Sequence, residues 1–240
     1  SMSSLTIPLS LVNFEDDSFS GTSIAAIELD ENHTALSFSD YVLSSKDGSV
    51  IYMIQSGLES YTIGKDVEDA SAIIDALKNV ATLKEVKVEE GNTSYVAYYG
   101  VLYENKETVT SGDILLLPTA MTTFVIPEQM TAIYGGGWSD RVFYESNIDT
   151  LTYNKQGTYN SIIGAEAFAG ASNLESIDLT GVKEIGSYAF ENCTSLKEIR
   201  IPESVTYIGA AAFKGWTADQ TIYLPFKSGD VLPEGWSTSW

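Results

Sequence analysis

The stretch LESIDLTGVKEIGSYAFENCTSLKEIRIPESVTYIGAAAFKGW, residues 174–216, consists of two nearly identical halves. An apolar strand-like run, an Ile-Gly pair and a phenylalanine occur in each half in the same order, and Phe190 and Phe213 lie 213 − 190 = 23 residues apart. A fixed period of 20–50 residues indicates a protein built from stacked repeats. The repeat therefore has to be traced through the whole chain before any single element is assigned.

Further copies of the pattern occur on both sides of this stretch. Ile163-Gly164 and Phe168 form one more copy upstream, and IPEQMTAI at 126–133 matches IPESVTYI at 201–208. The segment 77–83 aligns with 190–196, and LTIPLSLVNFEDDSF at 5–19 has the same spacing at the far end of the chain. The repeats thus cover essentially the whole sequence.

Two copies are longer than the others, at 29–63 and 88–126. Each contains an inserted pair of short β-prone runs around polar residues, Lys46-Asp47-Gly48 in the first and Thr110-Ser111-Gly112-Asp113 in the second. Alternating runs around such turn residues are typical of β-hairpins. We therefore predict that each long copy carries a projecting β-hairpin with its turn at those residues.

The repeat pattern predicts a solenoid. In LxxIxI the apolar residues point to one face of a short strand, and the following phenylalanine and small residues return the chain along the other side. One copy cannot bury its apolar face alone, so stacked neighbours form a continuous core. We predict a single α/β-type repeat solenoid over 1–240, with short irregular or helical outer segments and a C-terminal cap at 221–240 containing Trp236 and Trp240.

The composition excludes some classes of partner. Thirty-three acidic and 13 basic residues give a net charge of −20, which repels phosphate backbones and anionic lipids, so nucleic acid is not expected as a partner. The longest apolar run, at 114–118, is far below the ~20 residues that span a bilayer, so no membrane insertion is expected. No secretion signal is visible at the N-terminus, and Ser1-Met2 is typical of a cloning residue. We therefore expect an excised ectodomain or a mature fragment.

The repeats resemble the BspA-like leucine-rich repeats of bacterial cell-surface proteins. The resemblance rests on the pattern IP..V..IG..AF..C..L..I.IP at 177–213, on the hairpin-bearing unit at 92–103 and on the ending IYLPF…GW…W at 222–240. It implies a leucine-rich repeat fold, a secreted or cell-surface location and a role in protein binding or adhesion. It carries over no catalytic residue and no cofactor.

The residues that could support catalysis are few. The chain has one histidine, His33, and one cysteine, Cys193, and the strand count places them five rungs apart, roughly 24 Å at ~4.8 Å per rung. A Cys–His dyad needs about 3 Å, so we expect no such dyad, and one histidine with one cysteine cannot form the usual zinc site. Cys193 aligns with Val80, Ala171 and Trp216 and is expected to be a buried packing residue, and His33 is expected to be a solvated loop residue equivalent to Thr93.

The outward strand positions predict a polar face in two columns. Nine of its eighteen residues are Ser or Thr and no two carboxylates are neighbours, so the paired carboxyls of a glycosidase are not expected. Asp178 is expected to face Arg200 as a cross-strand ion pair. The columns are Ser4, Ala26, Ser60, Glu85, Thr123, Thr150, Ser176, Glu198 and Thr221, and Thr6, Glu28, Thr62, Lys87, Val125, Thr152, Asp178, Arg200 and Tyr223.

Two further features resemble ligand sites, namely acidic clusters and repeated glycines. The acidic clusters 15–17 and 30–32 offer hard oxygen ligands for calcium, but neither has the spacing of a known calcium loop, so solvated charge is favoured and no metal or other cofactor is predicted. Gly164, Gly186 and Gly209 each follow an inward isoleucine and do not open a helix, so they are expected to serve backbone geometry and not phosphate binding.

The repeat breaks at Gly135-Gly136-Gly137-Trp138, where Ile126 to Phe143 spans 17 residues against 12 from Ile201 to Phe213. A loop on a rigid frame often carries binding, which makes Trp138 and Arg141 candidate ligand residues. Aromatic residues also gather nearby, and aromatic platforms suit sugars and protein hot spots. They are Tyr95, Tyr98, Tyr99, Tyr103, Tyr134 and Tyr144.

The sequence favours a non-enzymatic surface module that binds a protein partner through the strand face and the hairpins. The candidate binding residues are Tyr98, Tyr99, Tyr103, Trp138, Arg141, Asp178 and Arg200. Two alternatives stay open, namely a glycan-binding module that uses the tyrosine- and tryptophan-rich loops, and a structural spacer within a larger surface protein.

Overall fold

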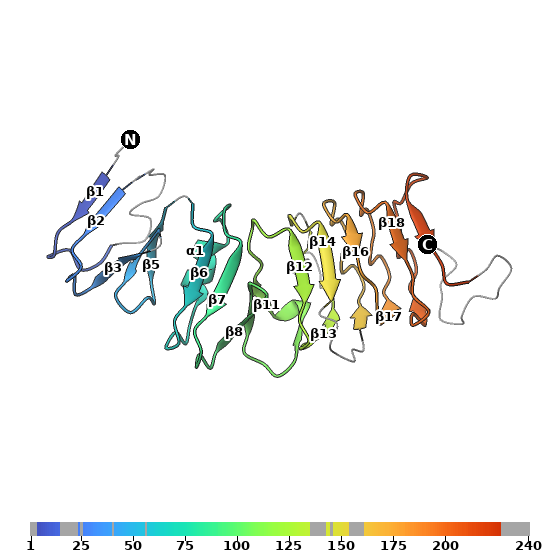
Figure 1. Cartoon of the computed structure of the whole chain (residues 1–240), viewed down its shortest axis with the longest axis horizontal. Helices are drawn as coiled ribbons and strands as arrows, with labels where there is room; N and C mark the ends of the chain where they lie inside the picture. Colours follow the sequence, from blue (N-terminus) through green and yellow to red (C-terminus); the bar gives the residue numbers. More distant parts are fainter. Residues whose placement is uncertain are drawn as a thin grey trace. The chain divides into compact units, whose positions relative to one another are not determined.

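The computed structural model describes residues 4–14, 24, 26–39, 41–55, 57–134, 143–144, 146–153 and 161–226. The chain divides into two compact units. Figure 1 labels the helices and strands and colours them by their position in the sequence. Unit 1 comprises residues 1–105 and 115–120, and unit 2 comprises 106–114 and 121–240. The expectation of one domain over 1–240 stays a prediction.

Unit 2 contains two sets of parallel strands, and successive repeats contribute short strands to each. The first set contains β12 (Thr123–Ile126), β14 (Thr150–Tyr153) and β16 (Ser176–Ile177), followed by the pair β18 (Glu198–Arg200) and β20 (Thr221–Tyr223). The second contains β10 (Val109–Thr110), β13 (Met130–Ile133), β15 (Ser161–Ile163), β17 (Val182–Ile185) and β19 (Tyr207–Ile208). Parallel pairing of strands about one repeat apart is the geometry of a β-solenoid.

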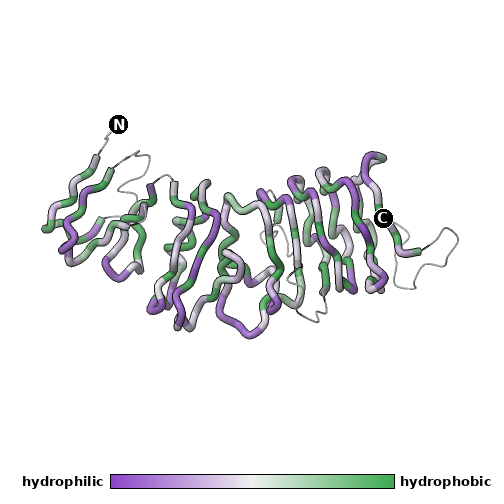
Figure 2. The backbone as a smooth tube through the Cα atoms, viewed as in Figure 1, coloured by the Kyte–Doolittle hydropathy of each residue, from purple (hydrophilic) through white to green (hydrophobic). Residues whose placement is uncertain are grey.

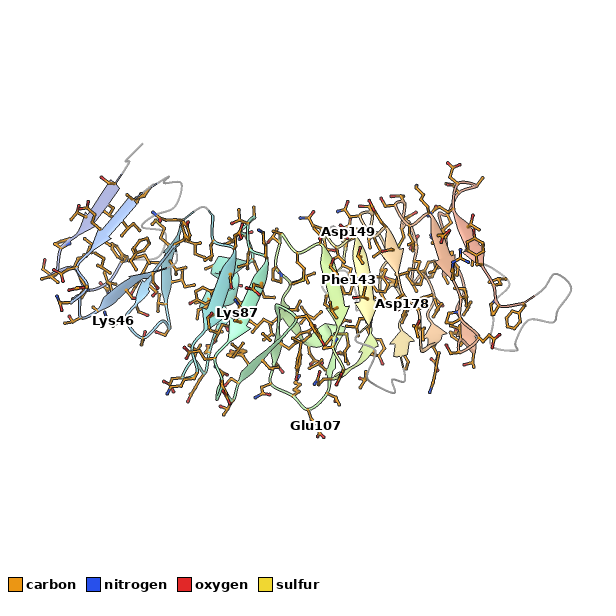
Figure 3. All side chains as sticks on the ribbon, in the orientation of Figure 1. Lys46, Lys87, Glu107, Phe143, Asp149 and Asp178 are labelled. Atoms are coloured by element: carbon orange, nitrogen blue, oxygen red, sulfur yellow. The ribbon has the colours of Figure 1, made fainter. Side chains whose placement is uncertain are left out.

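The core of unit 2 is built around a column of aromatic rings, one from each successive repeat. Neighbouring ring centroids lie 5.0 to 5.7 Å apart, and the last two phenylalanine pairs are stacked with interplanar angles of 6° and 5°. Phe143, labelled in Figure 3, is 2% exposed. The column consists of Phe124, Phe143, Phe168, Phe190 and Phe213 and ends on Trp216.

The Ile-Gly pairs allow successive turns of unit 2 to approach closely. A Cβ on Gly186 would clash with the backbone of Ala165, and one on Gly209 with the backbone of Ser187. Neither glycine has a positive φ, so the absent side chain matters here and conformational freedom does not. These glycines were expected to serve backbone geometry. The structure adds a second reason, because the backbone of the neighbouring turn occupies the space that a Cβ would need.

Unit 1 combines parallel solenoid strands with inserted antiparallel ones. β1 (Ser4–Ile7) pairs with β2 (Ala26–Leu29), and β6 (Ser60–Ile63) with β7 (Glu85–Val88), both in parallel. The inserted sheets are β3 (Leu36–Ser39), β4 (Val42–Ser45) and β5 (Ile51–Ile54), and β8 (Tyr95–Tyr98), β9 (Val101–Glu104) and β11 (Ile114–Leu116). The central strand is β4 in the first of these sheets and β9 in the second.

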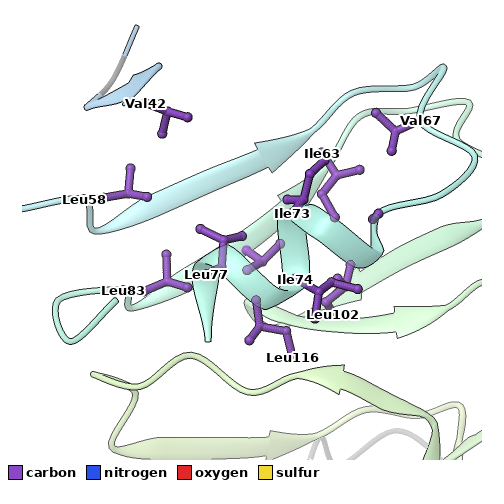
Figure 4. Close-up of a cluster of buried hydrophobic side chains, with 12 residues drawn as sticks. Val42, Leu58, Ile63, Val67, Ile73, Ile74, Leu77, Leu83, Leu102 and Leu116 are labelled. Carbon is purple, nitrogen blue, oxygen red and sulfur yellow. The ribbon is translucent and has the colours of Figure 1, made fainter. Parts of the chain in front are cut away.

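The only α-helix in the described part of the chain, α1 (Ser71–Leu77), lies in unit 1. Its buried residues Ile73, Ile74 and Leu77 enter one apolar cluster with Leu58 and Leu83, shown in Figure 4. Leu77 and Leu83 are both fully buried, as expected from their alignment with Phe190 and Leu196. By the alignment of 77–83 with 190–196, this short helix lies where unit 2 has the end of β17 (Val182–Ile185) and the turn that follows it.

The first long copy contains the expected hairpin turn and the second does not. β4 and β5 are antiparallel on either side of 46–50, as predicted. In the second copy the hairpin joins β8 to β9, and its two-residue turn is Tyr99-Gly100, both with positive φ. Thr110–Asp113 instead enters the solenoid, where η1 (Ser111–Asp113) follows β10 and the Asp113 carboxylate accepts hydrogen bonds from the Thr110 N–H and hydroxyl.

The hairpins are also more deeply embedded than predicted. Val101, Leu102 and Tyr103 of β9 are 0–1% exposed, and Val42 and Leu43 of β4 are at most 5% exposed. A strand buried on both faces belongs to the core, so the prediction of projecting hairpins is wrong for β4 and β9. What is exposed is the turn: Tyr41 and Tyr99 are half exposed.

The predicted fold class, a leucine-rich-repeat solenoid, is confirmed. Its described outer segments are mostly strands and turns, with little helix. Within unit 2, Figure 2 shows hydrophilic and hydrophobic residues alternating along each turn. The same local geometry recurs at three IP positions, where the N–H groups of Leu11, Met130 and Val205 each donate to the proline carbonyl three residues earlier. Trp236 and Trp240 of the expected cap lie outside the described residues.

Candidate interaction surface

The predicted strand columns exist wherever the structure describes paired strands. In unit 1 Ser4 pairs with Ala26 and Ser60 with Glu85. In unit 2 Thr123, Thr150 and Ser176 follow one another in register. No ladder joins β16 to β18, so the register of unit 2 is interrupted between the two strands.

The predicted ion pair between Asp178 and Arg200 is wrong. β16 ends at Ile177, and the Asp178 carboxylate accepts hydrogen bonds from the Thr180 N–H at 2.9 Å and hydroxyl at 2.6 Å. Short polar side chains commonly accept hydrogen bonds from the backbone two residues ahead in this way. Here Asp178 forms this local turn and no ion pair with Arg200 on the next strand. Figure 3 labels Asp178.

Arg200 instead forms an exposed cluster with two residues of its own sheet. Its guanidinium lies 4.0 Å from the centroid of the Tyr223 ring on β20, and its Nη2 lies 3.3 Å from a carboxylate oxygen of Glu198 on β18. The side chains of Arg200 and Glu198 are 66% and 56% exposed, and Tyr223 is 41% exposed. We call Glu198, Arg200 and Tyr223 the β18–β20 cluster.

The candidate tyrosines of the second long copy have three different environments. Tyr103 is fully buried, and its ring lies 5.5 Å from that of Tyr98, which is half-buried. Burial raises the pKa of Tyr103, as does the neighbouring Tyr98. The prediction that Tyr103 contacts a ligand is therefore wrong, because it is a packing residue, whereas Tyr99 is 48% exposed.

The remaining aromatic candidates lie in or near the segment 135–144. Trp138 and Arg141 lie outside the described residues, so the expectation of a binding loop there stays a prediction. Tyr134 and Tyr144, on either side of that segment, are 46% and 44% exposed. The Tyr95 hydroxyl is committed to the protein, since it accepts a hydrogen bond from the Ala70 N–H at 2.9 Å.

His33 is buried, contrary to the expectation of a solvated loop residue. It is 1% exposed, and its Nδ1 accepts hydrogen bonds from the N–H groups of Ala35 and Leu36. Asn92 does the same with Ser94 and Tyr95, so Asn92 is its structural equivalent and not Thr93. The sequence alignment was wrong by one residue, because a histidine and an asparagine accept the same two backbone hydrogen bonds although their side chains differ.

Cys193 is the buried packing residue that the repeat predicts. It is fully buried, its Sγ donates to the Phe168 carbonyl at 3.1 Å, and burial raises its pKa to about 12. Trp216 occupies the same place one repeat later, and its Nε1 donates to the Phe190 carbonyl at 2.9 Å. A buried thiol with a raised pKa is mostly protonated near neutral pH and is a poor nucleophile.

The described residues contain no cluster of three or more His, Cys, Asp or Glu side chains that could hold a metal ion. Of the two acidic clusters, 15–17 lies outside the described residues, and in 30–32 the Asp30 carboxylate accepts from the backbone and side-chain amides of Asn32. Nor is any described helix long and apolar enough to cross a membrane.

Two clefts in unit 1 were not predicted. One, of about 750 Å³, lies along β1, β2 and β3 and is lined partly by exposed acidic residues such as Glu28 and Glu31. The other, of about 660 Å³, lies between β3–β4 and the start of β6 and is lined by serines, Tyr41 and Tyr61. The serine-rich run SFSDYVLSSKDGS at 37–49 was the available signal for the second cleft.

Several solved structures are similar to this chain. The pneumococcal vaccine antigen PcpA is 23% identical, with a TM-score of 0.41 over 88% of this chain and 48% of PcpA. A leucine-rich cell surface protein from Faecalibacterium prausnitzii is 20% identical, with a TM-score of 0.36 over 89% of this chain and 51% of that one. A leucine-rich repeat protein from Bacteroides ovatus is 17% identical, with a TM-score of 0.38 over 98% and 74%.

The chain thus spans about half the length of the first two of these proteins. No curated protein matches it. The family is shown by the repeat itself, because the BspA type leucine-rich repeat region matches in six copies, over residues 1–98 and 137–229. These ranges cover most of the sequence, and the chain belongs to the BspA-type leucine-rich repeat family.

Proposed function

We propose that the chain is a non-enzymatic recognition module, displayed outside the cell, that binds a protein partner through the strand face of unit 2. The observation that carries the proposal is the exposed β18–β20 cluster, in which Arg200, Tyr223 and Glu198 stand side by side on paired strands. Arginine and tyrosine are enriched among the residues that dominate protein–protein binding energy.

The arrangement of the cluster favours binding over internal stabilisation. Exposed ion pairs contribute only about 0–1 kcal/mol to folding, so the Glu198–Arg200 contact is not needed to hold β18 in place. The pair nevertheless orients the guanidinium over the Tyr223 ring and so presents a partly preorganised surface to a partner. Membership in a family of cell-surface repeat proteins supports the extracellular location.

The test is surface binding with purified extracellular-matrix and bacterial surface proteins as separate probes, measured by biolayer interferometry. We expect saturable binding of at least one probe. Arg200→Ala and Tyr223→Ala should each weaken that binding by about tenfold or more, which corresponds to the loss of about 1.4 kcal/mol.

Unit 2 offers a matched control of the same chemistry in turn residues. Lys214 lies 2.8 Å from a Glu191 carboxylate oxygen and 5.3 Å from the centroid of the Tyr188 ring. Lys214→Ala should leave binding unchanged. Equal losses in Lys214→Ala and Arg200→Ala would show that net charge matters and the strand face does not, and no binding to any probe would refute the proposal.

A further inference from the structure

The hairpins of the two long copies can be aligned residue by residue from their hydrogen bonds and strand register. His33 and Asn92 make the same two hydrogen bonds, and 92 − 33 = 59 sets the offset. The cross-strand pairs agree with it, since Ser37 opposes Ser44 in the first copy and Val96 opposes Tyr103 in the second. The comparison therefore identifies equivalent positions without relying on sequence similarity.

On one face of the hairpin the two copies differ in side-chain size. The second copy has Val96, Tyr98 and Tyr103, of which Tyr98 and Tyr103 pack against each other with ring centroids 5.5 Å apart. The first copy has Ser37, Ser39 and Ser44 at these three positions, and all three serines line the cleft of about 660 Å³. The cleft thus lies where large side chains have been replaced by small hydroxyl-bearing ones.

One of these serines is almost completely buried at the cleft. Ser44 is 9% exposed, and it lines the cleft. A hydroxyl that lines a cleft can exchange a hydrogen bond to water for one to a bound molecule with hydroxyl groups. Ser37, its cross-strand neighbour on the same face, also lines the cleft.

The rest of the lining defines what could bind. Val42 and Leu58, both labelled in Figure 4, supply an apolar surface, and the half-exposed Tyr41 ring lies against Gly57 at the rim. An aromatic face beside hydroxyl donors and acceptors matches a ring that has apolar C–H faces and polar edges. The volume lies within the range of about 300–1,000 Å³ that is usual for small-molecule sites.

The charges in the cleft argue against an ionic ligand. Glu59 already pairs with Lys84 at 2.7 Å, and the Asp47 carboxylate accepts hydrogen bonds from the Ser45 and Ser49 hydroxyls. Lys46 is the only cation in a lining that also holds these two carboxylates, and the protein has a net charge of −20, so an anion is not favoured. A neutral polar molecule fits these conditions best.

We propose that this cleft binds a neutral sugar ring, with Tyr41 as its stacking platform and the hydroxyls of Ser37 and Ser44 as its hydrogen-bond partners. The site lies in unit 1 and is separate from the β18–β20 cluster, so it does not depend on the protein-binding function proposed above. It also differs from the tyrosine- and tryptophan-rich loops that the sequence suggested as a glycan site.

The test uses saturation-transfer difference NMR with the methyl glycosides of glucose, galactose, mannose and N-acetylglucosamine as separate probes. We expect at least one glycoside to bind the whole chain with a Kd of about 1 mM or below. Ser44→Ala should weaken binding about threefold to tenfold, because it removes a buried hydrogen bond and leaves the shape of the cleft intact. Tyr41→Ala should remove the stacking surface and lower affinity at least as much.

Two further variants keep the result interpretable. Tyr99→Ala removes the half-exposed hairpin tyrosine of the second copy and should leave sugar binding unchanged. Ser44→Tyr installs the residue of the second copy and should fill the cleft and abolish binding, with folding verified by circular dichroism. The proposal is overturned if no glycoside binds, or if Ser44→Ala and Tyr41→Ala bind like the wild type. It is also overturned if the cleft binds aromatic peptides and not sugars.

Discussion

The two long copies share one backbone plan and fill it differently. In both, a hairpin and a third strand form a small sheet whose central strand, β4 or β9, is buried. In the second copy Tyr103 packs the interior completely, and in the first the equivalent Ser44 borders a cleft. The repeat thus determines where the strands lie. The side chains at a few equivalent positions determine whether a copy is fully packed or has a cleft.

This difference also shows which positions can vary. Val42 and Val101 are equivalent and both buried, as are Leu43 and Leu102. Close packing tolerates little change at such sites. The residue after each leucine, Ser44 or Tyr103, carries the variation, which is why the comparison can be tested by exchanging residues between the copies.

The largest effect on stability is expected from removing the side chain that fills the second copy. Tyr103→Ser removes a fully buried ring beside Tyr98 and should lower the free energy of unfolding by about 3–5 kcal/mol, the range for truncating a buried aromatic residue. Denaturant unfolding followed by circular dichroism measures this change. A loss below about 1 kcal/mol would mean that the ring is not part of the core.

Tyr103→Phe is the matched control for that experiment. The Tyr103 hydroxyl is buried and has no hydrogen-bond partner in the described part of the chain. Removing the hydroxyl leaves the ring packing intact and abolishes an unfavourable burial, so we expect stability to stay constant or rise by about 1 kcal/mol. A large loss would reveal a partner for this hydroxyl.

The second prediction concerns the residues that close the turn before each hairpin. The Asn92 side-chain amide donates to the Gly64 and Val67 carbonyls and its oxygen accepts two backbone N–H groups. Asn92→Ala should cost about 2–4 kcal/mol in the free energy of unfolding, because buried backbone groups lose their partners. Asn92→His should cost less, since His33 shows that an imidazole Nδ1 can accept both N–H groups.

In His33 the other ring nitrogen, Nε2, is buried and has no partner among the described residues. The first copy therefore lacks the two donor bonds by which Asn92 binds the preceding turn. If Asn92→His and Asn92→Ala prove equally destabilising in the same unfolding assay, the equivalence of the two residues is wrong.

The parts of this fold that sequence predicts are those that repeat. The aromatic column, the buried Cys193 and the parallel strand register follow from apolar residues at a fixed period, since each copy must bury the same face. The turn at Tyr99-Gly100 was missed because tyrosine is unfavourable at positive φ and obscures the signal of the following glycine. The Asp178–Arg200 pair failed because a local hydrogen bond competed with a contact one repeat away.

The cleft was beyond prediction for a different reason. Serines at 37, 39 and 44 are ordinary in an exposed hairpin, and only burial of the hairpin makes them notable. Burial depends on packing against β6, which lies about twenty residues later in the chain. A one-residue error in aligning the two copies would also have paired the serines with the wrong residues.

The third prediction compares the aspartates near the two sites at which the sequence placed turns. At Asp113 burial, the largest single influence, raises the pKa, but hydrogen bonds from Lys106 and Thr110 outweigh it and the net pKa is lowered. A lowered folded-state pKa contributes stability that is present above the unfolded value of about 4 and is lost as pH falls through the folded value. Asp113→Asn should therefore cost about 1 kcal/mol near neutral pH and progressively less below about pH 4.

Asp47 is the counterpart in the first copy. Hydrogen bonds from Ser45 and then from Ser49 lower its pKa to about 2, and its side chain is exposed. Unfolding of Asp113→Asn, Asp47→Asn and the wild type across pH 2–7 tests the comparison. A difference between Asp113→Asn and the wild type that does not change with pH would exclude a role for the charge.

The smallest effect is expected at the turn of the second hairpin. Tyr99 has a φ of 51° and precedes Gly100 in a two-residue turn, where Asn-Gly is the preferred pair because asparagine tolerates the left-handed region. Tyr99→Asn should raise the free energy of unfolding by about 0.5–1 kcal/mol in chemical denaturation.

The control is Tyr207→Asn, on strand β19, which is 43% exposed and has no positive φ, and should give no gain. Equal gains in both variants would point to surface polarity as the cause, and a loss in Tyr99→Asn alone would mean that the tyrosine ring contributes more than its backbone strain costs. Since Tyr41 has a φ of 70° in the first hairpin, the second outcome would indicate that both copies retain a strained tyrosine for its ring.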